Sequence, residues 1–135
     1  MHEMSIAEGI LQVLEEQAVS QSFEKVKAVW VEIGPLATIE ADALTFCFDA
    51  VIRGSLAEGA SLHIIKMPGK AFCLQCLDTV PVTQRYDSCP VCGSYHLQIT
   101  QGEEMRIKEL EKRGIQTAYD RNYFRFKLFL YNYKH

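Results

Sequence analysis

The apolar positions of this chain follow two different periods, and each period predicts a different kind of element. Between residues 4 and 21 they recur every fourth residue, which is typical of the buried face of an amphipathic helix. That stripe consists of Ile6, Ile10, Leu14 and Ala18, and Leu11 widens it. Between residues 25 and 34, β-branched and other apolar residues occupy both alternating faces, so this run predicts a strand in the interior of a sheet.

A second amphipathic pattern covers residues 40–53 and predicts another helix. Its apolar side consists of Leu44, Phe48, Val51 and Ile52. Thr38 could cap the first turn with its side-chain oxygen, and Glu40 and Asp42 suit the positive end of the helix dipole. Gly54 and Gly59 bracket the turn that should end the helix.

Two more runs predict strands, at residues 61–67, where Pro68-Gly69 stops the run, and at residues 104–110. These elements predict an α+β fold in which two helices cover one face of a small three-stranded sheet. Four closely spaced cysteines lie between the second and third of these strands. We therefore expect the cysteine segment to be a module inserted into the fold.

The predicted boundaries divide the chain into an α/β domain (1–68 and 99–111), a cysteine module (69–98) and a tail (112–135). Residues 1–111 carry 8 Lys and Arg against 16 Asp and Glu, a net charge of −8. The tail carries 6 basic residues and one acid, a net charge of +5. The acidic body gives no electrostatic case for binding nucleic acid or an anionic membrane.

The cysteine module predicts a structural zinc site. Without a signal peptide or a membrane-spanning run we expect a cytoplasmic protein, where paired cysteines are metal ligands rather than disulfides. The pattern is Cys73-Leu-Gln-Cys76, twelve residues, and then Cys89-Pro-Val-Cys92-Gly93. Two such turns supply four soft thiolates for a tetrahedral Zn²⁺ with no open position, as in a zinc ribbon. A redox dithiol is the rival interpretation, but two pairs are present and neither opens a helix.

Other potential ligands have simpler explanations. Cys47 lies between two phenylalanines of the second helix and is predicted to be a buried free thiol. His63 falls in a strand, His96 lies four residues after Cys92, and His135 ends the tail. We expect each of these histidines to be an ordinary surface or core residue.

The first three residues could chelate a different metal. An α-amine on Met1 and the amide nitrogen and imidazole of His2 can close two fused rings around one ion, and Glu3 offers an oxygen nearby. Loss of the amide proton requires a metal that favours strong in-plane nitrogen donors, such as Ni(II) or Cu(II). Taken alone the pattern is weak, because a histidine at position 2 is usually a solvated residue on a frayed end.

Three further segments are distinctive: residues 1–5 (Met-His-Glu-Met-Ser), 29–34 (Val-Trp-Val-Glu-Ile-Gly) and 53–59 (Arg-Gly-Ser-Leu-Ala-Glu-Gly). Together with the cysteine module they resemble, in the same order, the hydrogenase nickel-incorporation family, also called HypA/HybF. The resemblance runs from residue 1 to about residue 111. It implies a nickel metallochaperone, not an enzyme, that delivers Ni(II) during maturation of [NiFe]-hydrogenase and, in some organisms, of urease.

The same resemblance implies nickel bound by Met1, His2 and Glu3. It also implies structural zinc bound by Cys73, Cys76, Cys89 and Cys92. The implied partners are a nickel-insertion GTPase of the HypB type and the hydrogenase large subunit. Competing interpretations are a zinc ribbon that binds nucleic acid and a purely structural zinc adaptor for the GTPase.

The tail departs from the family, whose pattern ends near Glu111. It holds seven of the fourteen aromatic residues, namely Tyr119, Tyr123, Phe124, Phe126, Phe129, Tyr131 and Tyr133. A basic aromatic segment could stack on single-stranded nucleic acid or dock on a partner. We favour simpler alternatives: the tail packs on the same chain, mediates homo-oligomer formation, or is not native to the gene product. Residues 124–133 are strand-like and would invite self-association if left exposed.

Overall fold

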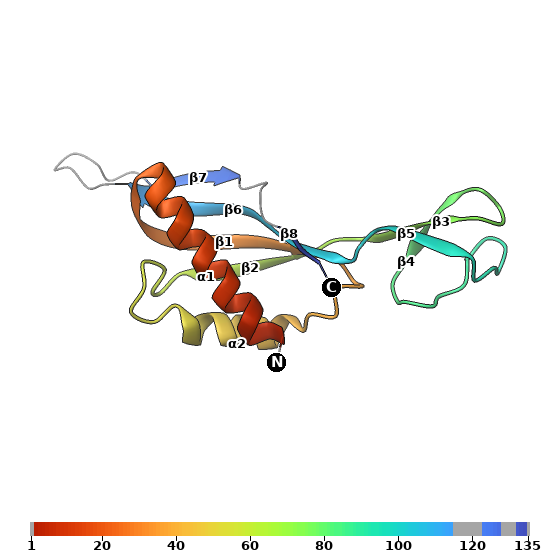
Figure 1. Cartoon of the computed structure of the whole chain (residues 1–135), viewed down its shortest axis with the longest axis horizontal. Coiled ribbons are helices and arrows are strands. Elements are labelled where there is room, and N and C mark those ends of the chain that lie inside the picture. The colour runs from red at the N-terminus through yellow and green to blue at the C-terminus, as the bar shows by residue number, and fades with distance from the viewer. Residues whose placement is uncertain (1, 115–122, 128–131, 135) are drawn as a thin grey trace.

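The computed structural model shows an elongated molecule, with two helices against a sheet at one end and a small all-β part at the other (Figure 1). It describes residues 2–114, 123–127 and 132–134, with side chains from Glu3 to Lys112. The helices are α1 (His2–Gln21) and α2 (Ala41–Val51). The strands are β1 (Phe23–Ile33), β2 (Ser61–Lys66), β3 (Gly69–Cys73), β4 (Thr79–Val82), β5 (Leu97–Gln101), β6 (Glu104–Gly114), β7 (Tyr123–Lys127) and β8 (Asn132–Lys134).

The larger sheet has β1 in its interior, as predicted. Its order is β2-β1-β6-β7, and β8 also pairs with β6. β1 runs parallel to β2, with α2 in the connection between them, and antiparallel to β6. The predicted α+β fold with two helices is confirmed. The sheet is larger than the predicted three strands because β7 and β8, which lie in the tail, extend it beyond β6.

The main core lies between the two helices and one face of this sheet. The predicted apolar stripes are confirmed: α1 buries Ile6, Ile10 and Leu14, and α2 buries Leu44, Phe48 and Ile52. Strand side chains from β1 and β6 complete the same cluster, among them Val29, Val31, Ile107 and Leu110. Burial of these side chains stabilises the domain by roughly 1.5–3 kcal/mol for each large residue.

The start of α2 corrects one prediction. Thr38 is not the N-cap; its φ of +53° places it in the loop before the helix. The cap is Glu40, whose carboxylate accepts hydrogen bonds from the amides of Asp42 (3.2 Å) and Ala43 (2.6 Å). A carboxylate is favoured there because it satisfies first-turn amides and lies at the positive end of the helix dipole. The prediction missed this because the longer Glu side chain is a less common cap than Thr.

The smaller sheet has the order β4-β3-β5 and belongs to the cysteine module. Its core contains Leu36, Ala71, Cys73, Val80, Val82 and Cys89. The predicted boundary at residue 98 falls inside β5, whose Ile99 and Gln101 pair with β3. The module is joined to the larger sheet by residues 67–68 on one side and 102–103 on the other.

Candidate metal centre

Each cysteine pair of the module sits in a tight turn held by backbone hydrogen bonds. In the first turn the amide of Leu77 donates to the carbonyl of Cys73 at 2.9 Å, and the amide of Cys76 donates to the Cys73 Sγ at 3.5 Å. In the second turn the amide of Gly93 donates to the carbonyl of Cys89 at 2.8 Å. Amides directed at a sulfur stabilise its thiolate form, so these turns prepare the sulfurs for a cation.

The two turns repeat the same geometry at equivalent positions. The amide of Cys73 donates to the carbonyl of Asp78 at 2.9 Å, and the amide of Cys89 donates to that of Ser94 at 2.7 Å. The residue after each second cysteine has a positive φ, +78° at Gly93 and +59° at Leu77. A glycine adopts a left-handed conformation without strain, so Gly93 suits its position. At Leu77 no sequence signal indicated it, because leucine rarely adopts that conformation.

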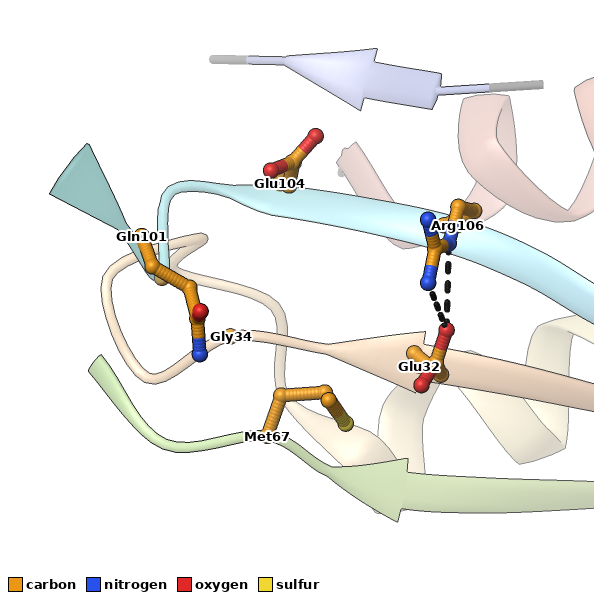
Figure 2. Close-up of a pocket in the computed structure, with 7 residues that line it drawn as sticks. Glu32, Gly34, Met67, Gln101, Glu104 and Arg106 are labelled. Carbon is orange, nitrogen blue, oxygen red and sulfur yellow. Dashed lines mark hydrogen bonds and ion pairs between the residues drawn. The ribbon is translucent and has the colours of Figure 1, made fainter. Parts of the chain in front are cut away.

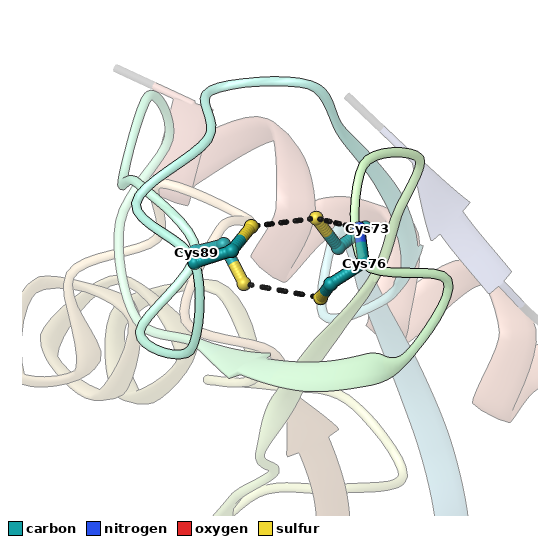
Figure 3. Close-up of side chains that lie close together, drawn as sticks. Cys73, Cys76 and Cys89 are labelled. Atoms are coloured by element: carbon teal, nitrogen blue, oxygen red, sulfur yellow. Dashed lines mark hydrogen bonds between the residues drawn. The ribbon is translucent and has the colours of Figure 1, made fainter.

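The four sulfurs converge at one point, as Figure 3 shows for the labelled side chains. The Sγ atoms of Cys73, Cys76, Cys89 and Cys92 all lie within 4.8 Å of one another. The Cys73–Cys92 and Cys76–Cys89 sulfurs are 3.5 Å and 3.8 Å apart. A tetrahedron with metal–sulfur bonds of about 2.3 Å has edges of about 3.8 Å, so the donor set fits Zn²⁺ in type, number and spacing.

Without a metal the sulfurs differ in acidity. The pKa of the Cys73 thiol is lowered to about 7, chiefly because the Cys76 amide donates to its sulfur. The pKa of the Cys76 thiol is raised to about 12, because burial and the neighbouring sulfurs disfavour a second negative charge. A divalent cation removes that conflict, since it binds all the thiols as thiolates. The convergence of four sulfurs, rather than two, fits a cation better than a reactive thiol pair.

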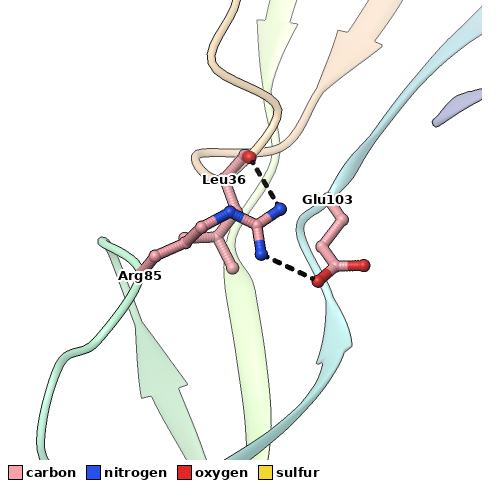
Figure 4. A network of polar contacts seen from close by, with 3 residues as sticks. All are labelled: Leu36, Arg85 and Glu103. Atoms are coloured by element: carbon pink, nitrogen blue, oxygen red, sulfur yellow. Dashed lines mark hydrogen bonds and ion pairs between the residues drawn. The ribbon is translucent and has the colours of Figure 1, made fainter. Parts of the chain in front are cut away.

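Contacts between side chains of the two parts fix this module to the larger sheet. Leu36, in the loop between β1 and α2, is only 2% exposed and packs in the core of the module. Arg85 donates to the carbonyl of Leu36 at 3.4 Å and pairs with Glu103 at 3.2 Å, as Figure 4 shows. Sequence reasoning missed these three residues, because none belongs to a motif or to an amphipathic stripe.

The junction also requires close backbone contact and contains a small cavity. The amide of Leu36 donates to the carbonyl of Gly102 at 2.8 Å, and a methyl group on Gly34 would overlap the Gly102 backbone. The adjoining cavity has a volume of about 160 Å³. In Figure 2, Arg106 reaches across it and donates to one oxygen of Glu32, at 2.7 Å and 3.1 Å. This pair neutralises the one charged residue that is buried in the described part of the chain.

The predicted nickel residues lie at the start of α1. The helix begins at His2, two residues earlier than predicted, and Glu3 occupies its first turn, where a carboxylate suits the helix dipole. Met1 and the side chain of His2 lie outside the part of the chain that the structure describes. Nickel binding by Met1, His2 and Glu3 therefore stays a prediction.

The remaining potential ligands are placed away from the sulfur cluster. Cys47 is half-buried and packs against the main core, and His63 stacks on Trp30 with ring centroids 4.8 Å apart. His96 is exposed and is not part of the metal-binding group. His135 lies outside the described residues. Within the described residues, no helix is long and apolar enough to cross a membrane.

Comparison with known proteins gives consistent matches. Residues 1–112 match the sequence model of the family described as "Hydrogenase/urease nickel incorporation, metallochaperone, hypA". The "Hydrogenase maturation factor HypA" of Azotobacter chroococcum mcd 1 is 68% identical over 111 residues, which are 82% of this chain and 98% of that protein. The protein of the same name from Azotobacter vinelandii is 65% identical over 111 residues, which are again 82% of this chain and 98% of that protein.

Two solved structures also match. "Solution structure of the Ni metallochaperone HypA from Helicobacter pylori" has a TM-score of 0.62 and 26% identity, covering 84% of this chain and 98% of that one. "Solution structure of HypA protein" has a TM-score of 0.63 and 29% identity, covering 83% and 96%. The family match spans both helices, the central strands and all four cysteines. The chain therefore belongs to the HypA family of nickel-incorporation metallochaperones, whose members act in hydrogenase maturation and not as catalytic enzymes.

Proposed function

We propose that this chain carries Ni(II) on Met1, His2 and Glu3 and delivers it to [NiFe]-hydrogenase during maturation. The observation that carries the proposal is the family match, which begins at residue 1 and is to nickel-incorporation proteins. The α/β domain (1–68 and 99–111) is the nickel domain, and the cysteine module (69–98) holds a structural zinc. We propose hydrogenase as the main client because the relatives are named as hydrogenase maturation factors, with urease as a further client.

The position of His2 supports its amide as a nickel donor. The first amides of an α-helix have no acceptor within the helix, so loss of the His2 amide proton breaks no hydrogen bond of α1. Terminal helical turns also fray easily, so the chelating residues can rearrange when nickel enters or leaves. A donor with few ligands at a chain end releases its cargo more readily than a closed four-sulfur site.

At the cysteine cluster, Cys73, Cys76, Cys89 and Cys92 would hold Zn²⁺. When bound, zinc supplies a fixed tetrahedral cross-link and no open coordination position for catalysis. The small core of the module and its paired turns then keep their shape around the ligands. The cysteine module would thus hold a permanent structural zinc, whereas the α/β domain would hold nickel as an exchangeable cargo.

The partners we propose are a nickel-insertion GTPase of the HypB type and the hydrogenase large subunit, in the cytoplasm. We propose no role in nucleic-acid or membrane binding, because residues 1–111 carry a net charge of −8.

The first test is calorimetric titration of Ni(II) into zinc-loaded protein with an untagged Met1. We expect about one nickel per chain, loss of binding in His2→Ala, and unchanged zinc content in that variant. His63→Ala is the matched control, because His63 is an exposed histidine that lies on β2. Equal binding by wild type and His2→Ala would contradict the proposed ligands. No binding by either protein would favour a structural adaptor instead.

Acidification provides a second test of the same ligands. The imidazole and the α-amine must both be deprotonated to bind nickel, so protons compete with the metal. Nickel affinity should therefore fall as the pH is lowered towards 6. Titrations at a series of pH values measure this, and a constant affinity across the series would argue against a histidine and an amine as donors.

A further inference from the structure

The outer edge of β6 is covered by residues beyond the length of the relatives. The Azotobacter relatives are matched over 111 residues, which are 98% of their length, whereas this chain continues to residue 135. β1 occupies one side of β6, so β7 and β8 both pair along the other side. β7 and β8, together called here the extension, thus lie beyond the length of these relatives.

In the register of these strands, residues of opposite charge occupy facing positions. Each glutamate of β6 faces a basic residue of the extension. The pairs are Glu104 with Lys134, Glu109 with Lys127, and Glu111 with Arg125. Oppositely charged residues at directly facing positions stabilise antiparallel strands, and like charges destabilise them.

The apolar positions are in phase with the same register. Leu110 faces Phe126 and Met105 faces Tyr133. Leu110 and Met105 are fully buried in the main core, so their register partners lie at positions on the helix-covered side of the sheet. A slip of one residue would exchange the two faces and bring charged positions against apolar ones. The extension is therefore matched to this edge along both strands.

Without the extension, the edge of β6 is complementary to itself in charge, although Met105 would face Lys112 in the register that pairs these charges. In an antiparallel pair of two β6 strands, Glu104 can face Arg113, Arg106 can face Glu111, and Lys108 can face Glu109. In the same register, Ile107 faces Leu110. An uncovered edge strand of this kind is a template for pairing with another chain, and a two-fold axis would make both halves of the contact equal.

We propose that the extension is a cis-acting strand that prevents the edge of β6 from pairing with the same edge of a second copy. The surface is a strand-docking edge, and the partner it fits is another molecule of this chain. The inference rests on the sheet and does not depend on which residues bind nickel.

The test uses the full chain with Arg125→Glu and Lys127→Glu, which place like charges opposite β6. The charge-matched control is Lys66→Glu with Lys70→Glu, since neither position pairs with β6. Light scattering after size-exclusion chromatography should give a monomer for wild type and control. For the β7 variant it should give a concentration-dependent doubling of mass. At low concentration, amides of residues 104–114 should exchange on the order of tenfold faster in that variant.

A compensating change separates lost pairing from misfolding. Adding Glu109→Lys and Glu111→Arg to the β7 variant restores opposite charges across the two strands. This variant should again be a monomer, and the amides of β6 should again exchange slowly. A chain ended at Gly114 provides a second variant, and it should dimerise like the β7 variant. A dimeric wild type, or a β7 variant and a truncated chain that both remain monomeric, would overturn the proposal.

Discussion

The α/β domain and the cysteine module are held together by different forces. The domain buries a large apolar cluster to which two helices and two central strands contribute. The core of the module contains six buried residues; two of them are cysteines of the sulfur cluster and a third, Leu36, comes from the β1–α2 loop. The domain is stabilised mainly by the hydrophobic effect. The module has too small a core for that alone, and we propose that a bound metal stabilises it.

The surfaces of the two parts show the same contrast. Of the eight large hydrophobic residues that are exposed in the described chain, five lie in the module: Leu74, Leu77, Tyr86, Val91 and Tyr95. The module therefore exposes apolar side chains to water, whereas a larger domain would bury them. We therefore expect metal binding, more than the amount of apolar sequence, to determine whether this segment folds.

Removal of one ligand should have the largest effect. Cys76→Ser should release zinc and unfold residues 69–101, because structural zinc contributes an apparent ~10–16 kcal/mol in small metal-dependent domains. Metal analysis and hydrogen exchange measure the loss, and β1 should stay protected. Cys47→Ser is the control, since Cys47 packs outside the cluster. Retained zinc in Cys76→Ser would show that the four sulfurs do not act together.

A core truncation in the α/β domain should give the opposite pattern. Phe48→Ala removes a fully buried ring and should lower the free energy of unfolding by about 3–5 kcal/mol, while zinc stays bound under native conditions. Urea unfolding followed by the single tryptophan, Trp30 in β1, reports on this domain. Phe46→Ala is the matched control, because Phe46 is 74% exposed. Equal losses in the two variants would contradict the assigned core.

A change at the junction should affect the two parts together. Leu36→Ala should cost about 2–3 kcal/mol, since it removes a buried side chain from a small core. Exchange should increase in both β3 and the β1–α2 loop, because Leu36 connects them. Increased exchange in the loop alone would show that the module does not depend on this contact.

The smallest effects should come from the two equivalent turn positions. Gly93→Ala should destabilise the module by about 1–2 kcal/mol, because an L-residue is strained at a positive φ. Leu77→Gly should stabilise it by up to about 1 kcal/mol, because it relieves the same strain at the matching position. The stability of the module in each variant is measured by the temperature at which zinc is released. Changes of the same sign would show that the two turns are not equivalent.

Periodicity and spacing predicted most of this molecule. The stripes of α1 and α2, the interior position of β1 and the convergence of four cysteines depend on local patterns that a sequence displays directly. The Glu40 cap, the positive φ of Leu77 and the contacts of Leu36 with the module could not be read in this way. The Leu36 contacts depend on a distant segment that the tertiary fold brings close. The Glu40 cap and the φ of Leu77 are local, but both run against residue preference, because Glu is a less common cap than Thr and leucine rarely adopts a positive φ.

The two short connections of the module determine how it can move. Residues 67–68 and 102–103 both link it to the larger sheet, and the backbones of Gly69 and Gly102 approach each other closely between them. A body attached by a single linker can reorient in any direction, whereas one attached at two neighbouring points retains a single bending axis. The hydrogen bond from the Leu36 amide to the Gly102 carbonyl lies at this junction. A partner that binds the cysteine module therefore meets it in a restricted range of orientations relative to the α/β domain.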